Sequence, residues 1–359
     1  MNNFIKNLER EFDIHIVLSA RIKAYKNTYT KDEYGNITGL SLYNLYKVKL
    51  ENLNQLIPLA EHLTELILIS CHTIEISAIT HFKQLVSLKL VENQISHSDI
   101  EHILGLKKLT CLELAGTELN DTSIFAELTC LESLNIDSSY HLKEVKGLKK
   151  LSQLRYLSCG GIDFPSIEAI EGHEGITHFS ISCSAIESMV GIERFPNLTH
   201  LDFSSTSLKQ IEGLEGLKQL KTLDLSASLV SKISGLDTLE NLEKLNISWA
   251  ELSKIEGLAA LFNLIELDLG RNKITKIEGL DTLVNLKKLV LRENEIKKVD
   301  NLETLVNLEY LNIEMNKIKE IDTRFLFNIR KPCQVYLGGT SMKSKELGIN
   351  VPEHIDLYL

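Results

Sequence analysis

The stretch LIELDLGRNKITKIEGLDTLVN, residues 264–285, contains the pattern that decides the fold. Its opening phrase, L-x-x-L-x-L, returns every 22 residues, starting at Leu198, Leu220, Leu242, Leu264, Leu286 and Leu308. Looser copies start at Leu63, Leu85, Leu109, Leu131, Leu154 and Ile176. Self-similarity at such a period indicates stacked repeats. Because a stack grows linearly, all 359 residues can belong to one continuous solenoid.

Each repeat predicts one short strand and one tight return. The alternation L-x-L places two leucines on the same face of a strand, because successive residues point to opposite faces. The apolar spacing of three that follows favours a 3₁₀ or irregular segment over a full α-helix. A single repeat cannot bury its leucines, but stacked repeats with parallel strands can.

The two ends differ from the repeats. A degenerate opening turn begins near Ile37, and the chain before it starts with an amphipathic stretch around Phe4, Ile5, Leu8 and Phe12. Terminal repeats expose a core face, so covering segments are expected at both ends. We therefore predict an N-terminal cap over residues 1–36, about 12–13 turns over residues 37–327 and a C-terminal cap over residues 328–359.

These residues resemble the leucine-rich-repeat proteins of the 22-residue class, found in Sds22 phosphatase regulators and bacterial internalins. The family's asparagine stands at Asn93, Asn272, Asn294 and Asn316, and Cys71 takes the same slot. The resemblance covers roughly Ile37 to Phe327. It implies an α/β solenoid, a right-handed horseshoe with a parallel β-sheet on the concave face and 3₁₀ or irregular segments on the convex face.

The middle turns depart from this pattern. Their asparagine slot holds Thr117, Ser139, Ile162, Ser184, Thr206, Ser228 and Ala250. Serine and threonine can replace part of an asparagine's hydrogen bonds, but Ile162 and Ala250 cannot, so we expect looser loops at those two turns. Extra residues around Ser96–Asp99 and Ser138–Tyr140 predict a bulge at each place.

Composition limits the partners. A net charge of −10 disfavours nucleic acid and anionic membranes, which need clustered Lys and Arg, and favours a basic or mixed protein surface. The first residues have charges where a signal peptide needs an apolar run, and no apolar run approaches a transmembrane length. The six cysteines are scattered singly, which is typical of reduced thiols. We expect a cytoplasmic monomer, with secretion by an unconventional route as the alternative.

The concave surface supplies the candidate binding residues, because side chains between the buried leucines face outward. They are Asn135, Tyr156, His178, His200, Asp202, Thr222, Asp224, Asn246, Trp249, Asp268 and Tyr310. Short acceptors beside aromatic side chains suit a partner with Lys or Arg anchors. The phrase L-D-L-S is also the family's common strand sequence, so a purely structural role for each Asp stays open.

No catalytic or metal motif accompanies the repeats. His178 and His200 share one slot in adjacent turns, but no His or Cys spacing typical of zinc supports a metal site. HEGITH, residues 173–178, has its histidines five apart rather than four. We expect no cofactor and no enzymatic activity. The predicted function is a protein-binding scaffold; the alternatives are an Sds22-like phosphatase regulator, a host-directed bacterial effector and a small-ligand or metal receptor.

Overall fold

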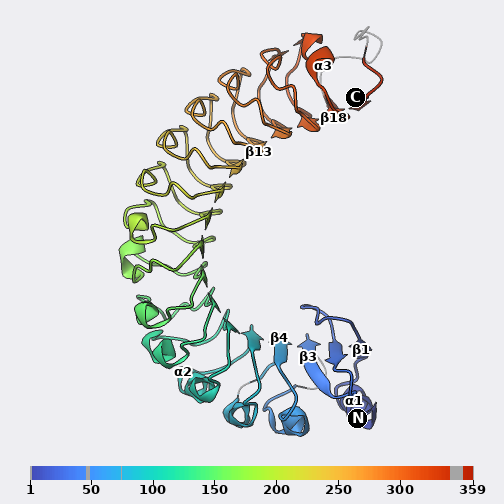
Figure 1. The fold of residues 1–359 in the computed structure, drawn as a ribbon, viewed down its shortest axis with the longest axis vertical. Helices are drawn as coiled ribbons and strands as arrows, with labels where there is room; N and C mark the ends of the chain where they lie inside the picture. Colours follow the sequence, from blue (N-terminus) through green and yellow to red (C-terminus); the bar gives the residue numbers. More distant parts are fainter. Residues whose placement is uncertain (1, 46–48, 74, 340–350, 359) are drawn as a thin grey trace. The chain divides into compact units, whose positions relative to one another are not determined.

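The computed structural model describes residues 2–45, 49–73, 75–339 and 351–358. The chain divides into two compact units. Unit 1 comprises residues 1–163 and 169–176, and unit 2 comprises residues 164–168 and 177–359. In each unit the strands line one wall and the short helices and loops line the other (Figure 1). The predicted solenoid of parallel strands and tight returns is therefore confirmed.

Unit 1 begins with an amphipathic helix and a hairpin. Helix α1 (Asn2–Phe12) buries Ile5, Leu8 and Phe12. Strand β1 (Val17–Leu18) pairs in parallel with β2 (Thr28–Lys31), and β2 pairs antiparallel with β3 (Ile37–Tyr43). The degenerate opening turn at Ile37 is thus a full strand, which then pairs in parallel with β4 (Glu65–Ile69).

The remaining elements of unit 1 alternate between strand and return. The strands are β4 (Glu65–Ile69), β5 (Ser87–Val91), β6 (Cys111–Glu113), β7 (Ser133–Asn135) and β8 (Tyr156–Ser158), each parallel to the one before. The returns contain η1 (Asn54–Leu59), η2 (Ser77–His81), α2 (His97–Ile100), η3 (Glu101–Gly105), η4 (Ser123–Glu127) and η5 (Leu148–Lys150). The 3₁₀ helix η6 (Ile167–Ala169) spans the boundary between residues 164–168, which belong to unit 2, and residues 169–176, which belong to unit 1.

Unit 2 is the more regular stack. Its main strands are β9 (His178–Ser180), β10 (His200–Asp202), β11 (Thr222–Asp224), β12 (Lys244–Asn246), β13 (Glu266–Asp268), β14 (Lys288–Val290), β16 (Tyr310–Asn312), β18 (Cys333–Tyr336) and β19 (Ile355–Tyr358), all parallel. Its other elements are η7 (Ile192–Arg194), α3 (Arg324–Asn328) and the two-stranded sheet of β15 (Lys298–Val299) and β17 (Glu320–Ile321). Within the predicted C-terminal cap, residues 355–358 form β19, which pairs in parallel with β18.

The two insertions lie outside the strands. At Ser96–Asp99 the predicted bulge is instead a helical turn, α2, whose first turn is capped by the Ser96 hydroxyl accepting from the Asp99 amide at 3.2 Å. The pairing of β5 with β6 keeps an unshifted register. At Ser138–Tyr140 the extra residue lies in the loop after β7, where Tyr140 projects into solvent.

The asparagine slot is closed in two different ways. Asn272 donates to the carbonyls of Leu269 in its own turn and Ile247 in the preceding one. Thr206 donates only to Phe203, in its own turn. Ile162 and Ala250, where the sequence predicts looser loops, are both buried.

Candidate partner-binding face

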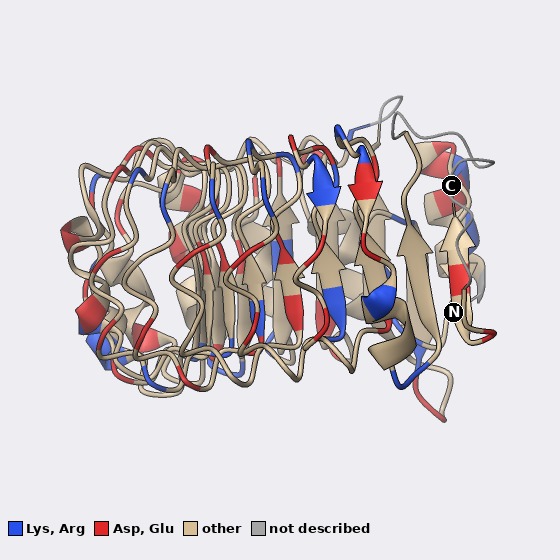
Figure 2. Ribbon diagram, turned by 90° about the horizontal axis from the view of Figure 1, so that it is seen from above, with Lys and Arg blue, Asp and Glu red and all other residues tan. Residues whose placement is uncertain are grey.

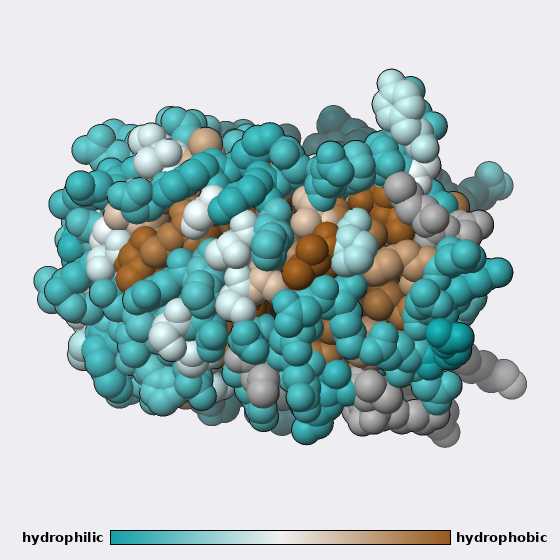
Figure 3. Space-filling model, turned by 90° about the horizontal axis from the view of Figure 1, so that it is seen from below, coloured by the Kyte–Doolittle hydropathy of each residue, from teal (hydrophilic) through white to brown (hydrophobic). Residues whose placement is uncertain are grey.

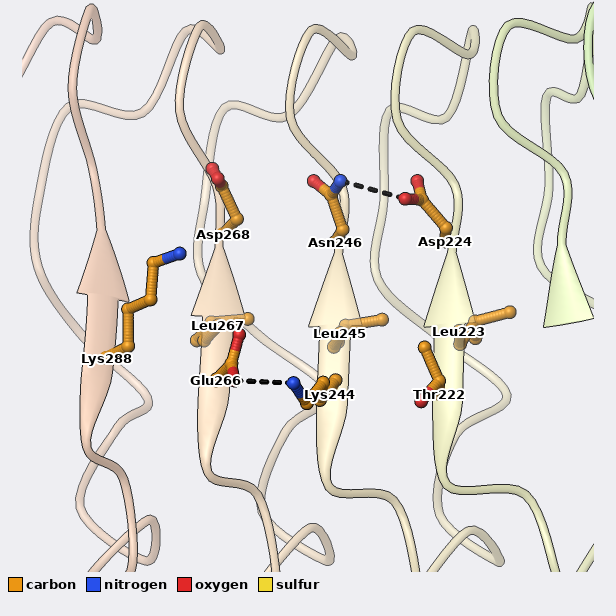
Figure 4. Close-up of a pocket in the computed structure, with 10 residues that line it drawn as sticks. All are labelled: Thr222, Leu223, Asp224, Lys244, Leu245, Asn246, Glu266, Leu267, Asp268 and Lys288. Carbon is orange, nitrogen blue, oxygen red and sulfur yellow. Dashed lines mark hydrogen bonds and ion pairs between the residues drawn. The ribbon is translucent and has the colours of Figure 1, made fainter. Parts of the chain in front are cut away.

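The outward-facing side chains of β11 to β14 form the best-defined candidate site. The central leucine of each strand, such as Leu223 or Leu267, is buried, so the residues on either side of it face away from the core. They enclose a shallow hollow of about 210 Å³. Its lining is Thr222, Leu223, Asp224, Lys244, Leu245, Asn246, Glu266, Leu267, Asp268 and Lys288 (Figure 4).

The acidic stripe, as we call Asp202, Asp224, Asn246 and Asp268, lies at the ends of four successive strands. In Asp202, Asp224, Asn246 and Asp268, one side-chain oxygen accepts from the backbone N–H two residues later, at 2.9–3.1 Å. These bonds satisfy backbone groups where each strand gives way to its loop. The structural role that the sequence left open is therefore present at all four residues, and any partner contact uses what remains of each side chain.

The second oxygens along the stripe differ. Asp202 Oδ2 accepts from the Ser180 hydroxyl at 3.0 Å, and Asp224 Oδ2 accepts from the Asn246 amide at 3.1 Å. Asp268 has no such cross-strand bond among the described residues, because Val290 occupies the paired position on β14. Burial raises the pKa of Asp268, against a lowering by the Gly270 N–H and by Lys288.

Charges of both signs share this face. Lys244 and Glu266, on adjacent strands, form an ion pair of 2.6 Å. Figure 2 shows Lys and Arg interspersed with Asp and Glu along the chain. The hollow is thus mixed in charge rather than uniformly acidic, and sequence reasoning missed the contributions of Glu266 and Lys288.

His178 and His200 lie together as the repeat spacing predicted. Their rings stack with centroids 4.0 Å apart and an interplanar angle of 8°. Thr177 and Thr199 each place a hydroxyl 2.9 Å from the Nδ1 of the following histidine. Burial lowers the pKa of both imidazoles, and the charge of His178 lowers that of His200 further. Among the described residues, no group of three or more His, Cys, Asp or Glu is arranged to hold a metal ion.

Trp249 is exposed and held in place. Its side chain is 58% exposed, and the Arg271 guanidinium lies 3.8 Å from its ring centroid. Arg271 is fixed in turn by an ion pair of 3.0 Å with Glu293. Trp249 also has a φ of 57°, a region that bulky residues rarely adopt. The equivalent positions of neighbouring turns, Ala227, Arg271 and Glu293, have the same left-handed φ, so this conformation belongs to the repeat.

Tyr310 belongs to an aromatic stack. Tyr310 lies 5.3 Å from Tyr336, and Tyr336 stacks on Tyr358 at 4.5 Å, measured between ring centroids. We did not identify Tyr336 and Tyr358 from the sequence. Aligning residues 333–339, CQVYLGG, with the repeat would have placed Tyr336 on the outward face. The strand that contains Tyr358 does not follow the L-x-x-L-x-L pattern, so the sequence gives no such alignment for it.

The two remaining candidates lie in unit 1. Asn135 ends β7, where its Oδ1 accepts from the Asp137 N–H at 2.9 Å. Tyr156 begins the neighbouring strand β8 and is 38% exposed. The nine other candidates lie in unit 2.

One face of the molecule is mainly hydrophilic. Figure 3 shows this face, on which polar side chains surround smaller areas of apolar surface. None of the helices in the described part of the chain is long and apolar enough to span a bilayer.

Comparisons with known proteins agree with the repeat architecture. The family model described as Leucine Rich repeats (2 copies) matches residues 196–238 and 284–326. No curated protein matches the chain.

Solved structures share the fold. An internalin, InlF, of Listeria monocytogenes has 23% identity and a TM-score of 0.67, covering 86% of this chain and 87% of that one. A leucine-rich-repeat protein of Leptospira interrogans has 23% identity and a TM-score of 0.68, covering 86% and 80%. Drosophila Toll, solved in complex with Spatzle, has 19% identity and a TM-score of 0.62, covering 86% and 48%. The family model and these structures show that the chain contains leucine-rich repeats and has the fold of leucine-rich-repeat solenoids.

Proposed function

We propose that this chain is a non-enzymatic scaffold that holds another protein against the strand face of unit 2. Leucine-rich-repeat proteins generally mediate protein–protein interaction, and Toll was solved with a protein bound. The proposal extends to a cytoplasmic monomer whose partner has a basic or mixed surface, and to caps formed by residues 1–36 and 328–359.

The observation that carries the proposal is the exposed, pre-ordered indole of Trp249. Exposed tryptophans are enriched among the residues that dominate interface energies, and a side chain already fixed before binding loses little entropy on binding. Arg271 covers one face of the ring, while 58% of the side chain stays open to solvent.

The test is affinity purification from the native cell with quantitative mass spectrometry, comparing the wild-type chain with Trp249→Ala. A partner that depends on this face should be depleted at least roughly tenfold, the effect of losing about 1.4 kcal/mol of binding free energy. Phe262→Ala is the matched control, because Phe262 is also an exposed aromatic residue, 52% exposed, but lies outside the strands. Equal recovery from both variants would contradict the proposal.

A second variant tests the acidic stripe without disturbing its strand-end bonds. Asp202→Asn with Asp224→Asn removes two charges but keeps the oxygen that accepts from the backbone, as Asn246 already does in its own turn. Reversal to Lys would break those bonds as well as the charge. A basic partner should bind the double Asn variant more weakly, with an unchanged thermal unfolding curve as the folding control.

A further inference from the structure

Asp224 and Asp268 occupy the same position two turns apart, yet only Asp224 is fully bonded. Asp224 Oδ1 accepts from the Ser226 amide at 2.9 Å and from its hydroxyl at 2.6 Å. Its Oδ2 accepts from the Asn246 side-chain amide at 3.1 Å. Both oxygens of Asp224 are therefore occupied before any partner arrives.

At Asp268 both of these additional donors are missing. Gly270 replaces the serine and has no hydroxyl, so Asp268 Oδ1 accepts only from the Gly270 amide, at 2.9 Å. Val290 replaces the asparagine at the paired position of β14 and has no side-chain donor. Among the described residues, none donates to the Oδ2 of Asp268, a residue that lines the hollow (Figure 4).

Neither of the two lysines that line the hollow fills this gap, and Lys244 is paired with Glu266. Lys288 lines the same hollow from β14, but no ion pair joins it to Asp268 in the described structure. Its ammonium instead lies 5.9 Å from the ring centroid of Tyr310. A partly buried carboxylate with an unused oxygen is costly unless a donor approaches it, and a charged donor compensates it best.

We propose that Asp268 is the anchor for an arginine side chain of the partner protein, which enters the hollow over β11 to β14. This inference rests on the proposed function and names the contact that would orient the partner. Glu266, two residues earlier on the same face of β13, is already paired with Lys244, so Asp268 is the carboxylate of the hollow with an unused oxygen. A guanidinium has five donors in a planar fork, so it can donate to Asp268 Oδ2 and to a further acceptor of the lining at once, whereas a compact ammonium acts as a point charge.

The sharpest test changes no charge. Val290→Asn introduces at β14 the amide that β12 already has at Asn246, and this amide should occupy Asp268 Oδ2. The probe is the peptide acetyl-Gly-Arg-Gly-amide, and its neutral isostere with citrulline is the control ligand. Binding is followed by NMR at the Gly270 amide, which is bonded directly to Asp268.

The arginine peptide should shift the Gly270 resonance in the wild-type chain, and the citrulline peptide should not. Val290→Asn should weaken the arginine peptide at least roughly tenfold, as expected for one charge-assisted hydrogen bond. Lys288→Met should tighten binding, because it removes a competing cation. Equal shifts with both peptides, or unchanged binding in Val290→Asn, would overturn the anchor.

Two further arms separate folding and function from the anchor itself. Asp268→Asn keeps the acceptor for the Gly270 amide but removes the charge, so it gives the same readout if Val290→Asn does not fold. Loss of the natural partner from Trp249→Ala, together with unchanged arginine binding in Val290→Asn, would reject the anchor and leave the proposed function standing. Arginine binding that is lost in Val290→Asn, with no partner lost from Trp249→Ala, would reject the proposed function instead.

Discussion

The side-chain amide of Asn294 donates to the carbonyl of Leu269, which lies in the preceding turn, at 2.9 Å. The same amide donates to Leu291 at 3.0 Å, and Asn294 Oδ1 accepts from the Ile274 N–H at 3.0 Å. One buried side chain therefore satisfies backbone groups of two successive turns, and it joins those turns together.

Asn294→Ala should destabilise the chain more than Thr206→Ala. The first change leaves several buried backbone groups without partners, at about 1–3 kcal/mol each before relaxation. The second removes only the 2.8 Å bond from Thr206 to Phe203 in its own turn. Urea denaturation of both variants measures the difference in free energy of unfolding. Equal losses of this free energy in the two variants would contradict this account of the asparagine slot.

Ser139→Ala should leave stability unchanged or raise it slightly. The Ser139 hydroxyl is fully buried and has no hydrogen-bond partner in the described part of the chain. Its removal takes away an uncompensated polar group, which is neutral or favourable. Ser184→Ala is the matched control, because the Ser184 hydroxyl donates to Ile181 at 2.8 Å and its loss should cost about 1 kcal/mol. A Ser139 variant that unfolds as readily as the Ser184 variant would refute the prediction.

Gly257→Ala should be among the most damaging glycine substitutions in unit 2. Gly257 has a φ of 69°, and an added Cβ would clash with the carbonyl oxygen of Ile233. Backbone strain of this kind costs about 1–3 kcal/mol, and the steric clash adds to it. Gly216→Ala is the control, because a Cβ there meets nothing within 4 Å. Thermal unfolding of the two variants should separate them by several degrees.

The stacked histidines should make stability depend on pH below about pH 6.5. Burial lowers the pKa of both His178 and His200, and Lys221 adds to the lowering at His200 while Glu243 opposes it. The unfolded chain therefore binds protons before the folded chain does. The neutral pair contributes fully above the unfolded pKa, and that contribution is lost as pH falls.

Denaturation at about pH 7.5 and about pH 5.5 measures this dependence. His200→Asn should lose part of the fall in free energy of unfolding that the wild type shows between those values. His141→Asn is the control, because His141 is exposed and lies outside the stack. An equal fall in all three proteins would show that the pair has no part in it.

Most of the fold was predictable because its information is local and repeated. The spacing around Leu264 and Leu267 places a strand in every turn, and the structure has each of these strands. The asparagine slot was predictable in kind, since one amide suits the end of a strand. Its weakening at Ser139 was not predictable, because the Ser139 hydroxyl has no partner in the described part of the chain, whereas Ser184 and Thr206 in the same slot donate to carbonyls of their own turns.

The sequence by itself determined the 22-residue period, the buried leucines and the outward-facing row that contains Asp224 and Asp268, because these follow from alternation along one strand. Only the tertiary structure decided which of those side chains are already occupied. Asp224 is bonded by Asn246 and Asp268 is left open beside Val290, because each depends on the residue aligned with it one turn away. The packing of Trp249 on Arg271 has the same origin, since stacking brings together side chains that are 22 residues apart in the chain.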